Sequence, residues 1–360
     1  MSEPLEIRGN TEQIDAKWMS HVMEHAGVAQ GEIINTAHFE GFIGTGQTGQ
    51  NARYRLHWSH QGSRPGSVIV KFASGDKSVR DYGYASGAYK TEVAFYNQLA
   101  RQMQVRVPDC YAALYDETKP DSVIVMEDLC FSRQGDQLSG LTADQCALAI
   151  SGAVGFHAPR WGDPTLVDFA PHKSPELFAA LLLPAYQAAI GTFMERLGDQ
   201  IDADIIALIH DMGGWLGDWF TSSQLPATLI HMDFRADNLM FGVNKQAPPL
   251  VVIDWQTASV GAASWDVAYL LGAAFQPEVR ARLERDLLKQ YIEEMKVAGI
   301  ELKFEQVWHE YRLGALWGLF MAVGATAVAE ETERGNNMLI QMAQSHGRHA
   351  LDLETVSLLC

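Results

Sequence analysis

The residues best suited to chemistry lie in one short segment, His231-Met232-Asp233-Phe234-Arg235-Ala236-Asp237-Asn238. An aspartate in a loop can orient an attacking hydroxyl group and accept its proton, and an asparagine five residues later can bind magnesium. A second aspartate, Asp254, follows the apolar run 250–253. A carboxylate at the end of a buried strand is costly to desolvate unless a cation or hydrogen-bond donors satisfy it, which makes Asp254 a natural magnesium ligand. This order of groups is suited to phosphoryl transfer.

A glycine-rich segment, Gly44-Thr45-Gly46-Gln47-Thr48-Gly49, lies far upstream of that loop. In a dinucleotide-binding protein such a G-x-G-x-x-G run opens a helix, but here it leads into a segment that alternates with a period of two, which predicts a strand. A glycine loop between two antiparallel strands covers the phosphates of ATP in kinases. On this motif alone, an ordinary glycine-rich hairpin stays open as an alternative.

Two charged residues follow the glycine segment at informative distances. Lys71 closes the β-branched run 67–72, and Glu92 lies 21 residues further on in a segment with helical spacing. A lysine that neutralises the phosphates of ATP needs a carboxylate to hold it, and a helical glutamate after a strand lysine supplies one. Taken singly, Lys71 could be an edge residue, Asp233 a helix cap and Asn238 a turn residue. The joint order of all five groups is what favours a kinase.

The elements that must position these groups divide the chain near residue 129. Residues 33–43, 52–58, 67–72, 111–115 and 122–126 read as strands, and 11–28 and 89–102 as helices, with a polar loop before residue 89. Helical patterns dominate afterwards, at about 142–158, 175–197, 201–221, 264–274, 277–298, 303–329 and 335–350, with one hairpin between 239 and 253. We therefore expect an N-terminal lobe, 1–129, with an antiparallel sheet and one main helix, and a larger, mainly helical lobe, 130–360.

Composition and charge restrict the partners. The net charge is −17, and most of the excess lies beyond residue 129. Such a field repels a phosphate backbone and an anionic membrane, so we expect no nucleic-acid or membrane partner, and a cationic small substrate is mildly favoured. The uncharged stretch 313–329 is short, solitary and interrupted by glycines, which favours a buried helix. The N-terminus has no features of a signal peptide, so we expect a cytoplasmic protein.

Together these motifs resemble the aminoglycoside phosphotransferase and choline kinase branch of the kinase-like superfamily, most closely the bacterial relatives of ecdysteroid kinases. Supporting segments are 154–163, with a histidine and tryptophan before the catalytic loop, and 261–269. The resemblance implies an α+β, bilobal protein-kinase-like fold that binds ATP and magnesium. It implies a nucleotide site at Gly44, Gly46, Gly49, Lys71 and Glu92, with a hinge of Met126, Glu127, Asp128 and Leu129 whose backbone meets adenine.

The same resemblance assigns roles in the second lobe. It implies that Asp233 is the catalytic base, that Asn238 and Asp254 bind magnesium, and that Arg235 stabilises the transferring phosphate. Asp266 is expected to brace the catalytic loop, and His157 and His231 to be structural. The family usually has glycine where this chain has Met232, which could alter the loop, and Asp254-Trp255-Gln256 replaces the familiar D-F-G.

The acceptor is expected to be a hydroxyl group of a small molecule. Only eleven residues separate Asp254 from Asp266, which leaves no room for the long activation segment of protein kinases, so no protein substrate is expected. A hydrophobic, sterol-like or acyl alcohol is favoured by the ecdysteroid-kinase resemblance. An aminoglycoside- or choline-type cationic acceptor and a catalytically silent, nucleotide-binding pseudokinase are the alternatives. Trp265, Trp308, Tyr311 and Trp317 could line the acceptor pocket or form ordinary core.

Overall fold

A computed structural model describes residues 4–44, 48–169, 175–327 and 331–359. The chain forms two compact units. The first unit contains Met1–Gln102, Val107–Cys130 and Asp254–Thr257, and the second contains Met103–Arg106, Phe131–Ile253 and Ala258–Cys360. The short segment that begins with Asp254 therefore belongs with the N-terminal part of the chain.

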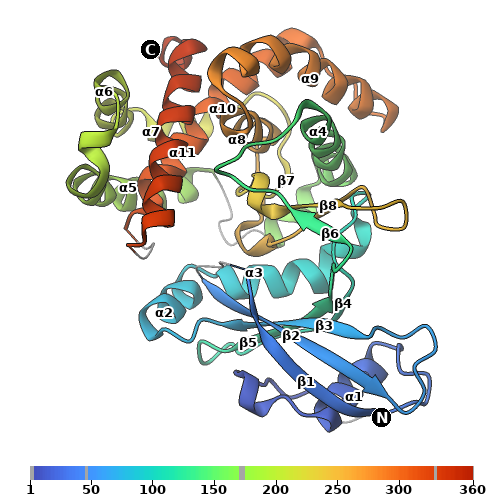
Figure 1. Ribbon diagram of the computed structural model, residues 1–360. Helices are drawn as coiled ribbons and strands as arrows, with labels where there is room; N and C mark the ends of the chain where they lie inside the picture. The colour runs from blue at the N-terminus through green and yellow to red at the C-terminus, as the bar shows by residue number, and fades with distance from the viewer. Residues whose placement is uncertain (1–3, 45–47, 170–174, 328–330, 360) are drawn as a thin grey trace. The chain divides into compact units, whose positions relative to one another are not determined.

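The first unit is built on an antiparallel sheet, drawn in blue to blue-green in Figure 1. Its strands are β1 (Ile34–Ile43), β2 (Gly49–Trp58), β3 (Ser67–Ala73), β4 (Cys110–Tyr115) and β5 (Ser122–Glu127). They lie in the order β1-β2-β3-β5-β4. The register pairs Asn51 with Lys71 and Lys71 with Ile124, which places Lys71 on the central strand. The strands predicted on the two sides of the glycine segment are confirmed as β1 and β2, and residues 45–47 of the loop between them lie outside the described residues.

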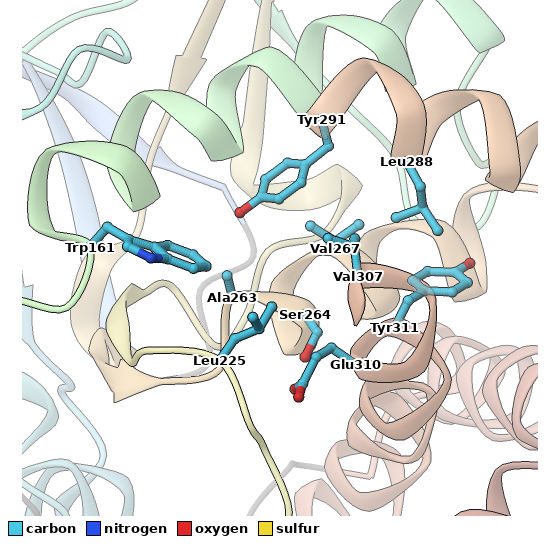
Figure 2. A pocket seen from close by; sticks show the side chains of 10 residues that line it. All are labelled: Trp161, Leu225, Ala263, Ser264, Val267, Leu288, Tyr291, Val307, Glu310 and Tyr311. Carbon is cyan, nitrogen blue, oxygen red and sulfur yellow. The ribbon is translucent and has the colours of Figure 1, made fainter. Parts of the chain in front are cut away.

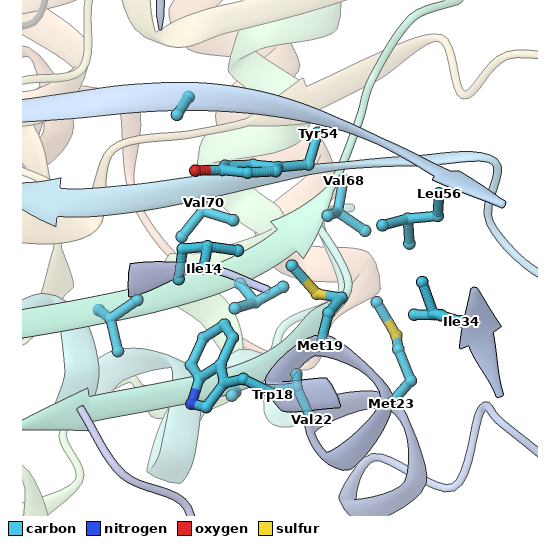
Figure 3. Packing of buried hydrophobic residues seen from close by; sticks show 14 of the residues in the cluster. Ile14, Trp18, Met19, Val22, Met23, Ile34, Tyr54, Leu56, Val68 and Val70 are labelled. Carbon is cyan, nitrogen blue, oxygen red and sulfur yellow. The ribbon is translucent and has the colours of Figure 1, made fainter. Parts of the chain in front are cut away.

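The core of the first unit lies between this sheet and α1 (Ala16–His25). Asp15 starts the helix by accepting a hydrogen bond from the backbone N of Trp18 at 2.7 Å, which satisfies one donor that the first helical turn leaves unpaired. Figure 3 shows side chains of α1, among them Trp18 and Met19, directed toward Tyr54 of β2 and Val68 of β3. The helix is shorter than the predicted segment 11–28 because residues 11–13 form a separate 3-10 turn.

Two further helices complete the first unit. The helix predicted at 89–102 is α3 (Ala88–Ala94), which continues as a wider π turn, Phe95–Leu99, and a 3-10 turn, Ala100–Gln102. The segment before it, expected to be a polar loop, instead contains α2 (Lys77–Ala85). Asp76 caps α2 by accepting hydrogen bonds from the backbone N atoms of Ser78 and Val79. The loop prediction was wrong. It rested on the many polar residues of the segment and overlooked Asp76 as a helix cap.

The second unit is mainly helical, from green to red in Figure 1. Its helices are α4 (Ala143–His157), α5 (Pro175–Leu197), α6 (Ala203–Met212), α7 (Leu216–Thr221), α8 (Ala263–Ala274), α9 (Pro277–Val297), α10 (Phe304–Ala325) and α11 (Glu333–Asp352). The single helix predicted at 201–221 is wrong: α6 ends before Gly213 and Gly214, two residues that disfavour helix. The prediction at 303–329 reaches into residues 328–330, which lie outside the described residues.

Two small sheets interrupt the helices of the second unit. The predicted hairpin is confirmed as β8 (Leu239–Gly242) and β9 (Leu250–Val252), and β6 (Ser132–Gln134) pairs with β8. Strand β7 (Thr228–Ile230) pairs with β10 (Ser259–Gly261). Strands β6, β7 and β10 have three residues each, too few for a periodic pattern to show in the sequence. Strand β7 directly precedes the segment 231–238, and β8 of the hairpin directly follows it.

Helix α10 packs in the interior of the second unit. Trp317 of this helix stacks on Trp265 of α8, and Trp265 stacks on Trp219 of α7 with ring centroids 5.1 Å apart. All three indoles are buried. The prediction that this uncharged stretch forms a buried helix is therefore confirmed for residues 313–325. Within the described parts of the chain, no helix has both the length and the apolar character that crossing a bilayer requires.

Candidate active site

Three of the predicted site residues meet in the first unit. Lys71 Nζ lies 2.8 Å from Glu92 Oε1 and 3.1 Å from Asp254 Oδ1. Strand β3 supplies the lysine, and α3 supplies the glutamate. The chain returns to this unit at Asp254, which adopts a φ of 64°, a value uncommon for residues other than glycine. The sequence prediction that Glu92 holds Lys71 agrees with this contact, and Asp254 is a second carboxylate on the same ammonium group.

The charges of this group influence one another strongly because the side chains are buried. Burial works against the charged form of Lys71, but Asp254 and Glu92 more than offset it and raise the pKa of the lysine above its ordinary value. Burial also raises the pKa of Glu92 from 4.5 to about 7, although the positive charge of Lys71 acts in the opposite direction. Two carboxylates therefore lie on the same buried ammonium group.

This shift gives the protein a specific pH dependence of stability. The folded chain holds a proton on Glu92 more tightly than the unfolded chain does between pH 4.5 and about 7, so the contribution of Glu92 to the free energy of unfolding falls as the pH rises through that window. The variant Glu92→Gln cannot titrate. Its stability relative to the wild type is therefore expected to increase between about pH 5 and about pH 8, as measured by urea unfolding at both values.

The matched control is Glu117→Gln, which removes an exposed carboxylate that pairs with Lys90. Its stability relative to the wild type should stay nearly constant over the same pH range, because surface ion pairs contribute little. A stability difference between Glu92→Gln and the wild type that is equal at both pH values would contradict the raised pKa of Glu92.

The glycine loop is partly described. Gly44 has a φ of 73°, which a glycine adopts without strain. A Cβ atom on Gly49 would lie 2.9 Å from the backbone O of Phe72 and 3.3 Å from Lys71 Cε, so the chain approaches β3 closely where the loop ends and β2 begins. Gly46 lies outside the described residues. Two hydrogen bonds hold Thr48 in place. Its Oγ1 donates to Gln256 Oε1 at 2.6 Å, and its backbone O accepts from the hydroxyl group of Tyr89.

The predicted hinge begins at the end of β5. Met126 and Glu127 are the last residues of that strand, and Leu129 is half-buried. Asp128 uses its carboxylate within the first unit, where it accepts hydrogen bonds from Arg53 Nη2 at 3.0 Å and from Ser67 Oγ at 2.7 Å. Its side chain is therefore engaged in holding β2 and β3, which suits a segment that would contact a ligand through its backbone.

The other predicted site residues meet in the second unit. Asp233 accepts hydrogen bonds from Arg235 Nε at 2.9 Å on Oδ1 and from Asn238 Nδ2 at 2.8 Å on Oδ2. Arg235 also pairs with Asp237. Burial works against the charged guanidinium, but the two aspartates raise the pKa of Arg235 above its ordinary value. Asp233 keeps 19% of its side-chain surface exposed, so this carboxylate is fixed but accessible.

Asp266 holds the backbone that carries Asp233. The buried carboxylate accepts from the backbone N of His231 at 2.7 Å and from that of Met232 at 2.8 Å. Met232 has a φ of 65°, the region that favours glycine, and its backbone O accepts from Trp317 Nε1 at 2.8 Å. These contacts agree with the expected bracing role of Asp266. They also hold methionine in a conformation that glycine adopts more easily.

The two histidines near this loop lie in the interior of the second unit. His231 Nε2 lies 2.9 Å from the backbone O of Ile253, and His157 contacts Tyr291 and Asp266 through its two ring nitrogens. Neither ring is exposed. Both residues therefore link the segments around the loop, in agreement with the structural role expected for them.

The donor set around Asn238 is compatible with magnesium. Its Nδ2 donates both to the backbone O of Asp233, at 2.7 Å, and to Asp233 Oδ2. This orientation leaves Asn238 Oδ1 available as a hard oxygen ligand, which magnesium prefers. In the described part of the chain, no group of three or more His, Cys, Asp or Glu side chains could hold a metal. A magnesium ion held through Asn238 Oδ1 would need phosphate oxygens, water or other oxygen groups as further ligands.

The four aromatic residues considered for an acceptor pocket lie mostly in the core. Trp265 and Trp317 belong to the buried stack described above, and half-buried Trp308 lies under the guanidinium of Arg285. Tyr311 lines a small cavity of about 20 Å³ in the second unit, together with Trp161, Leu225, Ala263, Ser264, Val267, Leu288, Tyr291, Val307 and Glu310 (Figure 2). This volume admits about one water molecule and no organic substrate.

Two contacts to the catalytic segment were missed from the sequence. Tyr269 OH donates to Asp233 Oδ1 at 3.1 Å, and Trp317 Nε1 donates to the backbone O of Met232. Tyr269 lies three residues after Asp266 in α8, so both side chains share one face of that helix. That spacing was an available signal. Trp317 lies 85 residues from Met232, and nothing local in the sequence indicates this contact.

Three solved structures share the fold of this chain, each at a sequence identity of 13% or below. Choline kinase from Cryptosporidium parvum has 12% identity and a TM-score of 0.53, with 91% of this chain and 90% of that chain covered. Plasmodium vivax ethanolamine kinase has 11% identity and a TM-score of 0.54, with 93% and 89% covered. The GDP and kanamycin complex of APH(2")-IIia has 13% identity and a TM-score of 0.51, with 84% and 90% covered. These likenesses confirm the α+β kinase-like fold.

The sequence itself matches a family model. No curated protein matches the chain. The model described as the phosphotransferase enzyme family matches residues 46–300, which is well over half of the chain and includes Lys71, Glu92, Asp233, Asn238 and Asp254. The match confirms the enzyme class expected from the sequence, a kinase-like phosphotransferase. The chain belongs to the phosphotransferase enzyme family.

Proposed function

We propose that this protein transfers the γ-phosphoryl group of ATP, in the presence of magnesium, to a hydroxyl group of a small organic molecule. The observation that carries the proposal is the geometry of Asp233, a partly exposed carboxylate held by Arg235 and Asn238 on a braced loop. Such a carboxylate can orient a hydroxyl group and accept its proton. Lys71 with Glu92 and Asp254 is the second set of groups that this reaction needs.

The first unit would bind the nucleotide. Lys71, kept charged and fixed by two carboxylates, would neutralise the phosphates, and the loop from Gly44 to Gly49 would cover them. The backbone of residues 126–129 would contact adenine. Because phosphoryl transfer depends mainly on positioning and charge, a preformed Lys71–Glu92 pair reduces the reorganisation that the reaction requires.

The second unit would position the acceptor. Asp233 would take the proton of the acceptor hydroxyl group, and Arg235 would stabilise negative charge on the transferring phosphate. Asn238 Oδ1 and the carboxylate of Asp254 would hold magnesium, and the ion would neutralise phosphate charge when bound. We propose that both sets of residues serve one reaction on one nucleotide, in the cytoplasm, without a protein, nucleic-acid or membrane partner.

Two classes of acceptor are candidates, and a different observation supports each of them. A hydrophobic, sterol-like or acyl alcohol is the first candidate, from the resemblance to ecdysteroid kinases. A cationic amino-alcohol or amino-sugar is the second, because residues 130–360 carry most of the net charge of −17. The fold is shared with a choline kinase, an ethanolamine kinase and a protein solved with kanamycin, which supports testing the second class in the same experiment.

An acceptor panel separates the candidates. The purified protein, ATP and magnesium are incubated with neutral sterols and long-chain alcohols in one set and with amino-sugars and choline-type alcohols in another. ADP release and the phosphorylated product, detected by mass spectrometry, are measured together. Phosphorylation of neutral alcohols is the expected result. Turnover of cationic acceptors alone would replace the first candidate by the second, and ATP binding without any product would indicate a pseudokinase.

A further inference from the structure

Tyr269 contacts the proposed base although nothing in the proposed function assigns it a role. Its hydroxyl group donates to Asp233 Oδ1 at 3.1 Å, and the residue is 2% exposed. Both residues belong to the second unit. A hydrogen bond to an ionised carboxylate is stronger and more directional than one between neutral groups. The contact therefore acts on the orientation of the carboxylate that would receive the proton.

Among the described residues, the other two side chains that donate to the carboxylate of Asp233 have second tasks in the proposed reaction. Arg235 Nε also donates to Oδ1, and Asn238 Nδ2 donates to Oδ2. The proposed function assigns Arg235 to the transferring phosphate and Asn238 to magnesium, so their positions would respond to a bound nucleotide. Tyr269 is enclosed in the helical core and has no such ligand. It is thus the donor whose position depends on the protein interior alone.

The ring of Tyr269 is held by the imidazole of His346 from α11. The two rings stack with centroids 5.1 Å apart and an interplanar angle of 27°. Two glycines from other helices admit the imidazole at this place. A Cβ atom on Gly272 of α8 would lie 2.4 Å from His346 Nδ1, and one on Gly318 of α10 would lie 2.1 Å from the same atom. Only glycine at both positions lets the imidazole lie against Tyr269.

The protonation states support a purely steric role for His346 and a donor role for Tyr269. Burial, followed by the positive charge of Arg280, lowers the pKa of His346 to about 3, so the ring is neutral near pH 7. Neither of its nitrogens has a hydrogen-bond partner within the described residues. Burial, followed by the charge of Asp233, raises the pKa of Tyr269 well above its ordinary value, so its hydroxyl group keeps the proton that it donates.

We propose that Tyr269 is a positioning residue that fixes the carboxylate of Asp233 for proton transfer, and that His346 holds the Tyr269 ring through its shape. The proposal rests on the proposed function, because it concerns the same base. It adds a residue from α8 to the donors around Asp233, where Arg235 and Asn238 come from the loop 231–238, and it explains why α8, α10 and α11 meet at two glycines.

The variant Tyr269→Phe removes the hydroxyl group and keeps the ring. We expect kcat to fall on the order of 10- to 100-fold, the range for the loss of one hydrogen bond to a charged group, and the KM for ATP to stay within about twofold. The matched control is Tyr186→Phe, which removes a buried hydroxyl group that donates to the backbone O of Ile209 at 3.0 Å, far along the chain from Asp233. A kcat for Tyr269→Phe equal to that of Tyr186→Phe would overturn the proposal.

A double-mutant cycle in rate separates positioning from general packing. In the background of Asp233→Asn, the change Tyr269→Phe is expected to cause no further loss of kcat. The effects of two substitutions are not additive when one residue acts through the other. An equal loss in both backgrounds would show that Tyr269 acts through packing alone and would also overturn the proposal. Melting temperatures of all four proteins confirm that the rates refer to folded enzyme.

The role of His346 is tested by two substitutions. His346→Leu keeps much of the volume without the ring nitrogens, and it is expected to retain a kcat within about threefold of the wild type. His346→Ala leaves a cavity beside Tyr269 and is expected to approach the kcat of Tyr269→Phe. A wild-type kcat in His346→Ala would remove His346 from the proposal, and so would a far larger loss in His346→Leu than in His346→Ala.

These results also distinguish the inference from the proposed function. If the wild type transfers phosphoryl groups and Asp233→Asn does not, the proposed function stands, and the kcat of Tyr269→Phe decides the inference alone. If the wild type transfers nothing to any acceptor and ADP release from ATP does not depend on Asp233, the proposed function fails and the inference fails with it.

Discussion

The variant Asp233→Asn is expected to lose phosphotransfer by about three orders of magnitude while it still binds ATP. Asparagine has nearly the same shape as aspartate, so the contacts with Asn238 and Tyr269 can persist in part. An amide, however, cannot accept the proton of an acceptor hydroxyl group. The proposed nucleotide groups, Lys71 and Glu92, belong to the first unit and are unchanged. The loss should therefore appear in kcat and leave the dissociation constant of ATP nearly the same.

The measurement is single-turnover phosphotransfer together with ATP titration by fluorescence or calorimetry. The control is Asp211→Asn, which changes an exposed aspartate in α6 of the same unit and should keep the wild-type rate. An unchanged rate in Asp233→Asn would refute the assignment of the base. Loss of ATP binding in this variant would show that Asp233 supports the nucleotide and not the proton transfer.

The variant Asp266→Asn is expected to lower the free energy of unfolding by about 2–4 kcal/mol and to reduce kcat strongly. Both carboxylate oxygens of Asp266 accept backbone N–H groups, from His231 and Met232, and the side chain is fully buried. An amide has only one acceptor oxygen. One of the two buried backbone N–H groups therefore loses its acceptor and faces the NH2 group of the new asparagine, which is itself a donor. Met232 is then free to leave its left-handed conformation, which is disfavoured by about 1–2 kcal/mol for residues with a Cβ atom.

Urea unfolding and steady-state kinetics on the same preparations test this prediction. Asp144→Asn, at an exposed position in the first turn of α4, is the control and should change stability by less than about 0.5 kcal/mol. Wild-type stability in Asp266→Asn would contradict the bracing role. A stability loss with an unchanged kcat would show that Asp266 supports the fold of α8 but not the geometry of Asp233.

Much of the fold was accessible from local patterns. The strand with Lys71 is a run of β-branched residues, most helices of the second unit have a helical periodicity, and the catalytic segment has a fixed order of polar groups. The failures have physical causes. Helix α2 depends on a capping aspartate within a polar segment, α6 and α7 are separated by two adjacent glycines, and the three-residue strands exist only through their partners.

The candidate site was accessible where chemistry restricts the residue type. Lys71, Glu92, Asp233, Asn238 and Asp254 were named as candidates because few side chains can do the work proposed for them. Tyr269 and Trp317 were not, since each contacts the catalytic segment from a helix whose position is set by tertiary packing. Met232 lies between these cases. The sequence showed a departure from the family pattern, and the structure locates it at a positive φ.

The most direct test of the account uses ATP labelled in the γ-phosphoryl oxygens and an unbiased mixture of small metabolites. The account predicts that one or more hydroxyl compounds gain a single labelled phosphoryl group, in amounts equal to the ADP formed, with wild-type protein and magnesium but not with Asp233→Asn. Label that appears only in free phosphate, or equally with both proteins, would contradict transfer to a small-molecule acceptor by this site.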